Sequence, residues 1–273
     1  DMLQFHTLTD EEVRQLSDTL FNARTTGKAL PEFPGKLPAT LEQAYAVQDL
    51  SIAASDDNVV GWKVGMVIPE LREQMKSERI MGPVFKNVAH FIGHSHGDNE
   101  YIELPVYTDG FIAVEAELMI EINREITPGS IDTSADLSHL IRHVYTGVEI
   151  ASSPVKDLND YGPTAIIADF GNNHGMVVGA PIEDWQSKIA TIETKCFIND
   201  ELINSAPANN VLNGPMAAFS YLIDQASKRN ITLPKGTMVC SGAITGVHET
   251  LVGSTSTVDF GEAGKINMKL VAF

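Results

Sequence analysis

The stretch Ile-Ala-Val-Glu-Ala-Glu-Leu-Met-Ile-Glu, residues 112–121, alternates apolar side chains with mostly acidic ones. A period of two predicts a half-buried β-strand, which places Glu115 and Glu117 on one face, about 7 Å apart. Two like charges held that close repel unless water, protonation or a cation relieves them. The stretch therefore leaves two interpretations open: a solvated face of an antiparallel sheet, or a carboxylate pair that binds a divalent cation.

A third carboxylate favours the second interpretation. Residues 144–150, Val-Tyr-Thr-Gly-Val-Glu-Ile, form an apolar, β-branched run that is typical of a buried strand. Glutamate is rarely buried without a partner, and a cation shared with Glu115 and Glu117 would give Glu149 one. The alternative is that Glu149 lies at a strand end and reaches water.

The composition limits the possible partners. The chain has 273 residues, of which 43% are hydrophobic and 20% are charged, as in globular proteins. Its formal net charge is −17. That excess of negative charge argues against nucleic acid and anionic membrane surfaces as partners. An anionic substrate would need a local cation to offset the general field.

Cysteine usage and hydropathy predict a cytoplasmic protein. Cys196 and Cys240 both lie in apolar, strand-like contexts, which favours buried free thiols over a disulfide framework. The chain contains no run of 18 apolar residues, so the sequence predicts no membrane-spanning helix. The first residues lack the basic and apolar pattern of a signal peptide.

The order of elements predicts an α+β fold, with a helical N-terminal segment on a large mixed, mainly antiparallel β body. Helices are expected after the capping residues Thr9 and Thr40, and one late helix from Pro215 to Arg229. We expect a single catalytic domain over 1–273, with 1–57 the helical segment and about 58–273 the β-rich body. The expected strands are 58–67, 100–104, 112–122, 144–151, 174–179, 188–199, 201–204, 237–240, 254–260 and 264–273.

One known catalytic motif occurs in the sequence without the structural context that it requires. Residues 93–97, Gly-His-Ser-His-Gly, fit the nucleophile elbow of serine hydrolases, but that motif requires a strand-to-helix turn. The following residues predict a turn and a strand, so we do not expect a serine nucleophile here. His94 and His96 lie in the same turn and are expected to be exposed and without a metal.

Two further segments are candidates for substrate contacts. Lys63, in an apolar strand with glycines on either side, can place one cation in a pocket of this acidic chain, although a lysine that reaches the surface is the alternative. Residues 241–246, Ser-Gly-Ala-Ile-Thr-Gly, allow close backbone approach to a ligand, although an ordinary turn is equally consistent.

Taken together, the segments resemble the 2-keto-4-pentenoate hydratase / 4-oxalocrotonate decarboxylase family of the fumarylacetoacetate hydrolase superfamily. The resemblance is co-linear from about residue 40 to the C-terminus. It is carried by Gly-Trp-Lys-Val-Gly at 61–65, Val-Glu-Ala-Glu-Leu at 114–118, Val-Glu-Ile at 148–150, Ala-Asp at 168–169 and the 241–246 turn.

The resemblance implies a set of roles for these residues. Mg²⁺ or Mn²⁺ would be held by Glu115, Glu117 and Glu149. The implied catalytic residues are Lys63 and Asp169, and the implied substrate-binding residues are Trp62, Ser241, Gly242 and Asn172. The substrate would be a short 2-oxo or 2-hydroxydienoic acid from the breakdown of aromatic rings, and the protein would be a homo-oligomer.

Three departures from the family pattern concern the reaction more than the metal. Where many hydratases have Pro-Asp-Phe-Gly, residues 79–82 read Arg-Ile-Met-Gly, as in decarboxylases with an apolar residue at the aspartate position. Residues 150–154 lack the Asp and Arg of the usual Ile-Val-Asp-Ser-Arg. Phe170 replaces the asparagine of Ala-Asp-Asn, with Asn172 and Asn173 close by.

The sequence thus predicts a divalent-metal-dependent lyase that adds water to a short unsaturated 2-oxo acid. The nearest alternative is a decarboxylase of the 4-oxalocrotonate type. Hydrolysis of a C–C bond in an acylpyruvate is less consistent, because no His-Glu pair lies near the site motifs. A metal-binding β module without activity remains open, because the usual Asp and Arg are missing.

Overall fold

The computed structural model of the chain describes residues 3–273, and Asp1 and Met2 lie outside the described residues. The predicted α+β class is confirmed. The helices are α1 (Asp10–Thr26), α2 (Leu41–Ala54), α3 (Arg72–Met75), α4 (Pro163–Ala168), α5 (Trp185–Lys188) and α6 (Pro215–Lys228). The strands are β1 (Phe5–His6), β2 (Leu37–Pro38), β3 (Val59–Met66), β4 (Arg79–Phe85), β5 (Ala89–Phe91), β6 (Ile102–Val106), β7 (Phe111–Ile122), β8 (Ile141–Ser153), β9 (Asn173–Pro181), β10 (Glu193–Ile198), β11 (Glu201–Pro207), β12 (Met238–Cys240), β13 (His248–Glu249), β14 (Thr255–Asp259) and β15 (Lys265–Ala272).

The two N-terminal helices begin at the predicted capping residues. The Thr9 hydroxyl accepts from the Glu12 N–H while the Glu12 carboxylate accepts from the Thr9 N–H, which completes a capping box at α1. The Thr40 hydroxyl accepts from the Gln43 N–H at the start of α2. Local sequence therefore decides where both helices begin.

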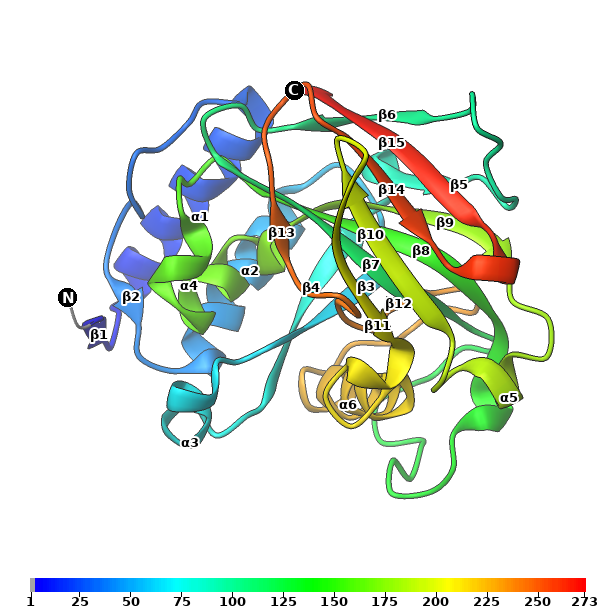
Figure 1. Cartoon of the computed structure of the whole chain (residues 1–273). Coiled ribbons are helices and arrows are strands. Elements are labelled where there is room, and N and C mark those ends of the chain that lie inside the picture. The colour runs from blue at the N-terminus through cyan, green and yellow to red at the C-terminus, as the bar shows by residue number, and fades with distance from the viewer. Residues whose placement is uncertain (1–2) are drawn as a thin grey trace.

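Two curled sheets make the β body. The larger has the order β4-β3-β12-β7-β8-β9-β5, with β13 also paired to β7, and the smaller has the order β11-β10-β14-β15-β6. Most pairs are antiparallel, and the parallel ones within these two sheets are β12–β3, β5–β9 and β15–β6. In Figure 1, α1, α2 and α4 lie together on one side of the larger sheet, and the smaller sheet lies on the other.

The prediction that the 112–121 stretch is a half-buried strand was wrong in one respect, because all twelve residues of β7 are buried. The apolar face, including Val114, packs in one cluster with Ile266 and Leu270 of the smaller sheet. The opposite face includes Ala113, which packs in a second cluster with Leu16 and Leu20 of α1. Glu115 and Glu117 follow on this second face, so their carboxylates lie between layers rather than in solvent.

The sequence reading missed several elements between the strands. Helix α4 and a 3₁₀ turn at Phe170–Asn172 connect β8 to β9. The strand expected at 188–199 is shorter, since α5 ends at Lys188 and β10 begins at Glu193. No helix follows the 93–97 motif, and the next element is β6, as expected.

The helices and the cysteines bear on further expectations from the sequence. Among residues 3–273, no helix is both long and apolar enough to cross a membrane. Both cysteines are buried and free, as predicted. The expectation of a single catalytic domain stays a prediction.

Candidate metal centre and pocket

Three carboxylates from two adjacent strands meet in the larger sheet. Glu115 and Glu117 lie on β7, and Glu149 lies on β8 directly opposite Glu115 in the antiparallel register. One carboxylate oxygen from each lies within 4.8 Å of the others. We call these three residues the carboxylate cluster.

The carboxylate cluster is buried but only partly hydrogen-bonded. Glu117 and Glu149 are fully buried and Glu115 is 6% exposed. The Gly242 N–H donates to Glu117 Oε1 over 2.8 Å, and Asn173 Nδ2 donates to Glu149 Oε2 over 3.0 Å. Within residues 3–273, Glu117 Oε2 and Glu149 Oε1 have no hydrogen-bond partner outside the cluster. Buried carboxylate oxygens are normally satisfied, so two orphaned ones fit a site that binds a cation.

Burial and mutual repulsion oppose ionisation of the cluster. Burial, and then the charge of Glu149, raise the pKa of Glu115 to about 8, against the opposing effect of Lys63. The same two causes, together with Glu115, raise the pKa of Glu117 well above its ordinary value. Like charges directly opposite on paired strands are destabilising, which is the position of Glu115 and Glu149.

Lys63 of β3 supplies the cation beside the cluster. Its Nζ lies 3.2 Å from Glu149 Oε2 and donates to the Gly171 carbonyl oxygen over 2.8 Å. Burial alone would lower the pKa of this ammonium, but the three carboxylates, Glu149 first, outweigh burial and raise it. Lys63 therefore lies in the interior, and the alternative of a lysine that reaches the surface is wrong.

The carbonyl that binds Lys63 belongs to an unusual turn. In residues 169–173, which we call the 169–173 turn, Phe170, Gly171 and Asn172 have φ values of 55°, 65° and 61°. A side chain at position 171 would meet Lys63 Cδ at 2.8 Å and Gly82 Cα at 3.1 Å. Only glycine fits this close approach, which brings the Gly171 carbonyl to the ammonium.

A pocket of about 360 Å³ opens onto this centre. Glu115, Lys63, Asn172 and Gly242 line it, so the structure brings together four residues predicted from the sequence. Its other walls are largely apolar: Val64, Val67, Ile68, Ile80, Ile166, Val211 and Val247. The volume suits a small organic molecule.

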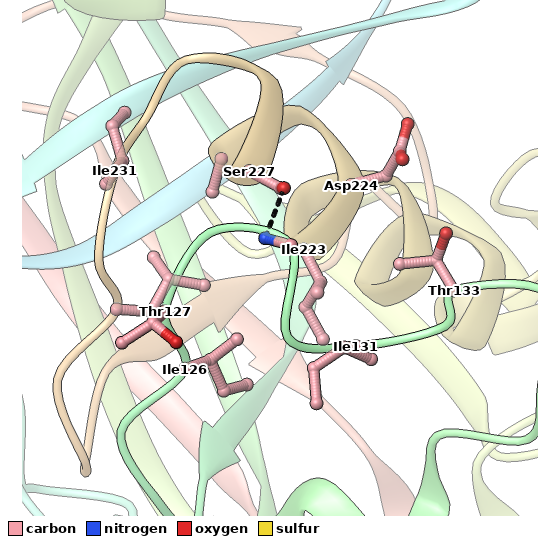
Figure 2. Close-up of a pocket in the computed structure, with 11 residues that line it drawn as sticks. Ile126, Thr127, Ile131, Thr133, Ile223, Asp224, Ser227 and Ile231 are labelled. Atoms are coloured by element: carbon pink, nitrogen blue, oxygen red, sulfur yellow. Dashed lines mark hydrogen bonds between the residues drawn. The ribbon is translucent and has the colours of Figure 1, made fainter.

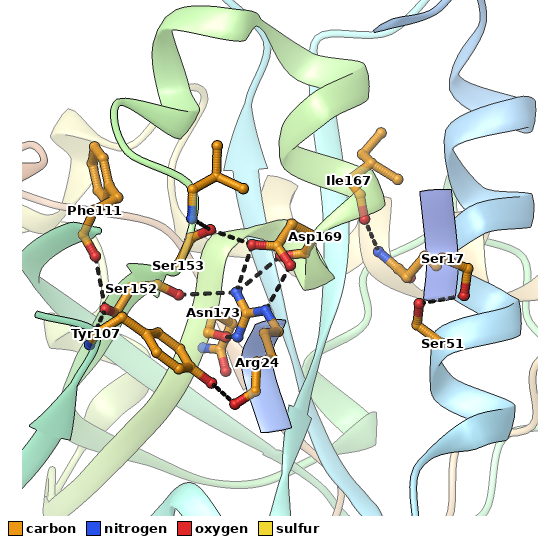
Figure 3. Close-up of polar contacts among 12 residues, drawn as sticks. Ser17, Arg24, Ser51, Tyr107, Phe111, Ser152, Ser153, Ile167, Asp169 and Asn173 are labelled. Carbon is orange, nitrogen blue, oxygen red and sulfur yellow. Dashed lines mark hydrogen bonds and ion pairs between the residues drawn. The ribbon is translucent and has the colours of Figure 1, made fainter. Parts of the chain in front are cut away.

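Besides Glu117 and Glu149 of the carboxylate cluster, three of the residues predicted to act on or bind the substrate do not line this pocket. Trp62 points away from Lys63, as neighbours on a strand do, and its ring lies under the guanidinium of Arg229 at 5.5 Å. Ser241 is fully buried and donates to the Leu118 carbonyl over 2.7 Å. Asp169 is buried in an ion pair with Arg24, shown in Figure 3. The roles predicted for these residues stay predictions.

Sequence reasoning missed three residues at the site. Asn173 binds Glu149, Gly171 binds Lys63, and Arg72 lines the pocket. Asn173 lies next to the predicted Asn172. A search for amide donors just after the Ala-Asp pair at 168–169 could have found it. Nothing in the local sequence distinguishes Arg72 from a surface arginine.

A second cavity, shown in Figure 2, lies between α6 and the segment after β7. Its volume is only about 30 Å³, close to the space of one water molecule. The Gly129 N–H donates to Ser227 Oγ at its wall, and Asp224 is its one ionisable lining residue. This cavity has neither the size nor the charged groups of the first.

Comparison with known proteins supports this description, although no family model matches the chain. The chain is 22% identical to the 2-oxo-hept-4-ene-1,7-dioate hydratase of Escherichia coli over 277 residues, covering 97% of this chain and 98% of that protein. It is 20% identical to the 4-oxalocrotonate decarboxylase of Pseudomonas putida over 271 residues, covering 97% and 99%.

Solved structures show the same fold. The 4-oxalocrotonate decarboxylase of Pseudomonas putida G7, in complex with magnesium and adipate, matches with a TM-score of 0.77 at 20% identity, over 97% of this chain and all of that one. The fumarylpyruvate hydrolase of Pseudomonas aeruginosa, in complex with Mn²⁺ and pyruvate, matches with a TM-score of 0.55 at 13% identity, over 81% and 94%. The resemblance expected from the motifs is confirmed.

Proposed function

We propose that this chain, a relative of the hydratases and decarboxylases of the fumarylacetoacetate hydrolase superfamily, is a divalent-metal-dependent lyase that acts on a short 2-oxo or 2-hydroxydienoic acid. The observation that carries the proposal is the buried carboxylate cluster, whose Glu115 lines a pocket together with Lys63. The metal-bound structural relatives support a divalent cation, which we expect to be Mg²⁺ or Mn²⁺. The predicted homo-oligomer stays part of the proposal.

The residues present fit such a cation. If all three glutamates are ionised, they and the Lys63 ammonium leave two uncompensated negative charges, which one divalent ion neutralises. Glu117 Oε2 and Glu149 Oε1 have no other partner, and hard cations prefer carboxylate oxygens as ligands. Glu115, Glu117 and Glu149 would therefore hold the metal, and Glu115 is the ligand next to the substrate.

The chemistry of the substrate fits the same site. When bound, a divalent cation supplies Lewis-acid stabilisation of the negative charge that develops on the 2-oxygen of a 2-oxo acid. Lys63, held between Glu149 and the Gly171 carbonyl, places a second positive charge at this end of the pocket. Asn172 offers a polar side chain at the wall, and the apolar residues exclude water from the reacting carbons.

Lys63 can also move a proton. Its pKa is raised only because the three carboxylates outweigh burial. Neutralising those carboxylates leaves burial dominant, which favours release of a proton from Nζ. The same side chain thus suits proton transfer to or from an enol intermediate in the charge-neutral centre.

One feature at the pocket points to a second acidic group on the substrate. Besides Lys63, Arg72 is the only lysine or arginine that lines the pocket in the described chain. Its Nε donates to the Val67 carbonyl over 2.8 Å, and no other hydrogen bond of this guanidinium occurs within residues 3–273. The free nitrogens suit a carboxylate. We propose that Arg72 binds the far carboxylate of a diacid, the class to which the adipate of the structural relative belongs.

Two reactions fit this substrate. Hydration, the reaction predicted first from the sequence, needs a proton delivered to carbon and a water activated for attack. Decarboxylation, the second candidate, needs an electron sink and one proton for the resulting carbanion. Ile80 lines the pocket from the 79–82 stretch, where many hydratases have an acid, and Glu115 is the only acidic lining residue in the described chain. This observation favours the second candidate.

The test uses purified protein with Mg²⁺ or Mn²⁺. Loss of the dienol absorbance of 2-hydroxypenta-2,4-dienoate supports hydration, and CO₂ release from an unsaturated 2-oxo diacid supports decarboxylation. Chelator and Glu115→Gln should each abolish turnover. Turnover that is unaffected by both would disprove a metal-dependent lyase. Tight Mn²⁺ binding without turnover of any 2-oxo acid would leave an inactive metal-binding module.

A further inference from the structure

Arg24 of α1 is buried and does not line the pocket, and its side chain makes five hydrogen bonds. Its Nε donates to Asp169 Oδ1 over 2.7 Å, and its Nη2 donates to Asp169 Oδ2 and to the Asp169 carbonyl, each over 3.1 Å. Nη1 donates to the Asn173 carbonyl and Nη2 to the Ser152 carbonyl, each over 2.9 Å. Ser153 Oγ also donates to the Asp169 carboxylate, as Figure 3 shows.

These contacts fix both ends of the 169–173 turn. Asp169 is its first residue and Asn173 its last, so one guanidinium binds the turn at each end. Between them lie three consecutive residues with positive φ, and Phe170 and Asn172 are not glycines. Such backbone costs on the order of 1–3 kcal/mol for each non-glycine residue and persists only where surrounding contacts hold it.

The other side of the turn faces the carboxylate cluster. The Gly171 carbonyl accepts from Lys63, and the Asn173 side chain donates to Glu149. The Asn173 side chain also donates to the Gly175 carbonyl and accepts from the Gly175 N–H. A change in the turn would therefore move the partners of Lys63 and Glu149 together.

We propose that Arg24 and Asp169 form a positioning pair that holds the 169–173 turn, and through it the orientation of Lys63 and Glu149. Asp169 then acts through the turn rather than by touching the substrate. The effect on metal binding rests on the proposed function, whereas the effect on the turn does not. A helix outside the pocket thereby contributes to the geometry of the metal centre.

The alternative is that Arg24 only attaches α1 to the sheet, and Arg229 offers a matched control. The two side chains are 6% and 7% exposed, and each pairs with an aspartate at 2.7 Å. Arg229 pairs with Asp49 and lies over the Tyr45 ring, without a contact to the turn. Arg24→Lys and Arg229→Lys each keep the charge but cannot reproduce the planar set of donors.

The experiment measures hydrogen exchange of the peptide covering 169–176 by mass spectrometry, and Mn²⁺ affinity by electron paramagnetic resonance without substrate. We expect Arg24→Lys and Asp169→Asn to speed exchange of this peptide at least about tenfold, because the held amides open more often. We also expect them to weaken Mn²⁺ binding by about 10- to 100-fold, the usual effect of removing a partner of a metal ligand. Arg229→Lys should change neither quantity.

Ser153→Ala keeps the inference testable if the charge variants do not fold. It removes one neutral donor to Asp169, and we expect a smaller change of both quantities in the same direction. Faster exchange confined to α1, with the 169–176 peptide unchanged, would overturn the proposal. Loss of turnover in Asp169→Asn with unchanged exchange and Mn²⁺ affinity would also overturn it, since Asp169 would then act on the substrate. If the wild type binds no Mn²⁺, the proposed function fails and the exchange data alone decide the positioning pair.

Discussion

Two buried charged groups lie on either side of the 169–173 turn, and they differ in how their charges are met. Arg24 and Asp169 neutralise each other, and Nε, Nη1 and Nη2 of Arg24 all donate hydrogen bonds. When its three glutamates are ionised, the carboxylate cluster has two more negative charges than Lys63 can offset, and two of its oxygens have no hydrogen-bond partner outside the cluster within residues 3–273.

This difference separates a structural ion pair from a binding site. A buried pair with complete hydrogen bonding supports the fold, and breaking it is costly. A buried group that keeps excess charge and raised pKa values destabilises the free protein, so it points to a site that binds a cation. The family resemblance grouped Asp169 with the catalytic residues, whereas its contacts are those of a structural ion pair.

The largest expected effect comes from Glu115→Gln. We expect turnover to fall by at least about 1,000-fold, since the metal's contribution to the transition state amounts to several kcal/mol. We also expect the metal-free protein to gain up to about 4 kcal/mol of unfolding free energy at pH 7.5, because Glu115 must take up a proton on folding whereas a neutral amide need not. Kinetics and urea unfolding in chelator measure both. If metal-free Glu115→Gln is less stable than the metal-free wild type, the carboxylate cluster does not destabilise the free protein as the comparison requires.

The next largest effect is expected at Lys63, which contacts both the 169–173 turn and the carboxylate cluster. Lys63→Gln should lower kcat by about 100- to 10,000-fold, because a cation and a proton carrier are lost together. Mn²⁺ should bind at least as tightly as in the wild type, since a positive charge beside the metal is removed. Steady-state kinetics and a Mn²⁺ titration separate the two effects. Weaker Mn²⁺ binding in this variant would show that Lys63 mainly supports the ligands.

A moderate effect is expected at Arg72, the second positively charged side chain that lines the pocket. Arg72→Gln should raise KM for a diacid substrate by about 10- to 100-fold, the value of one charge-assisted hydrogen bond, and should leave KM for the matching monoacid unchanged. Lys76→Gln, in the same segment but outside the pocket lining, is the control. Equal changes for both substrates would rule out recognition of the far carboxylate.

The last expected effect concerns the pH dependence of stability. The pKa of Glu115 is raised from 4.5 to about 8, so the folded state holds a proton that the unfolded chain releases. The unfolding free energy of the metal-free protein should therefore fall as the pH rises from about 5 to 8, by up to about 1.4 kcal/mol per pH unit from this group. The Tm in chelator between pH 5.5 and 8.5 measures it, and Glu115→Gln should flatten the profile. An equal slope in that variant would assign the effect to other groups.

The sequence by itself determined the elements that depend on local patterns. Alternation placed Glu115 and Glu117 on one face of a strand, β-branched residues marked the strand of Glu149, and Thr9 and Thr40 marked the helix starts. These features arise from side-chain periodicity and capping, which operate over a few residues.

Only the tertiary structure decided what those elements face. The register that sets Glu149 opposite Glu115, the layer that buries the acidic face of β7, and the contact of Arg24 with Asp169 all join distant segments. An alternating strand has the same pattern whether its polar face meets water or another layer, so periodicity could not distinguish the two. The sequence therefore shows the three glutamates of the metal centre as separate residues, and only long-range packing makes them neighbours.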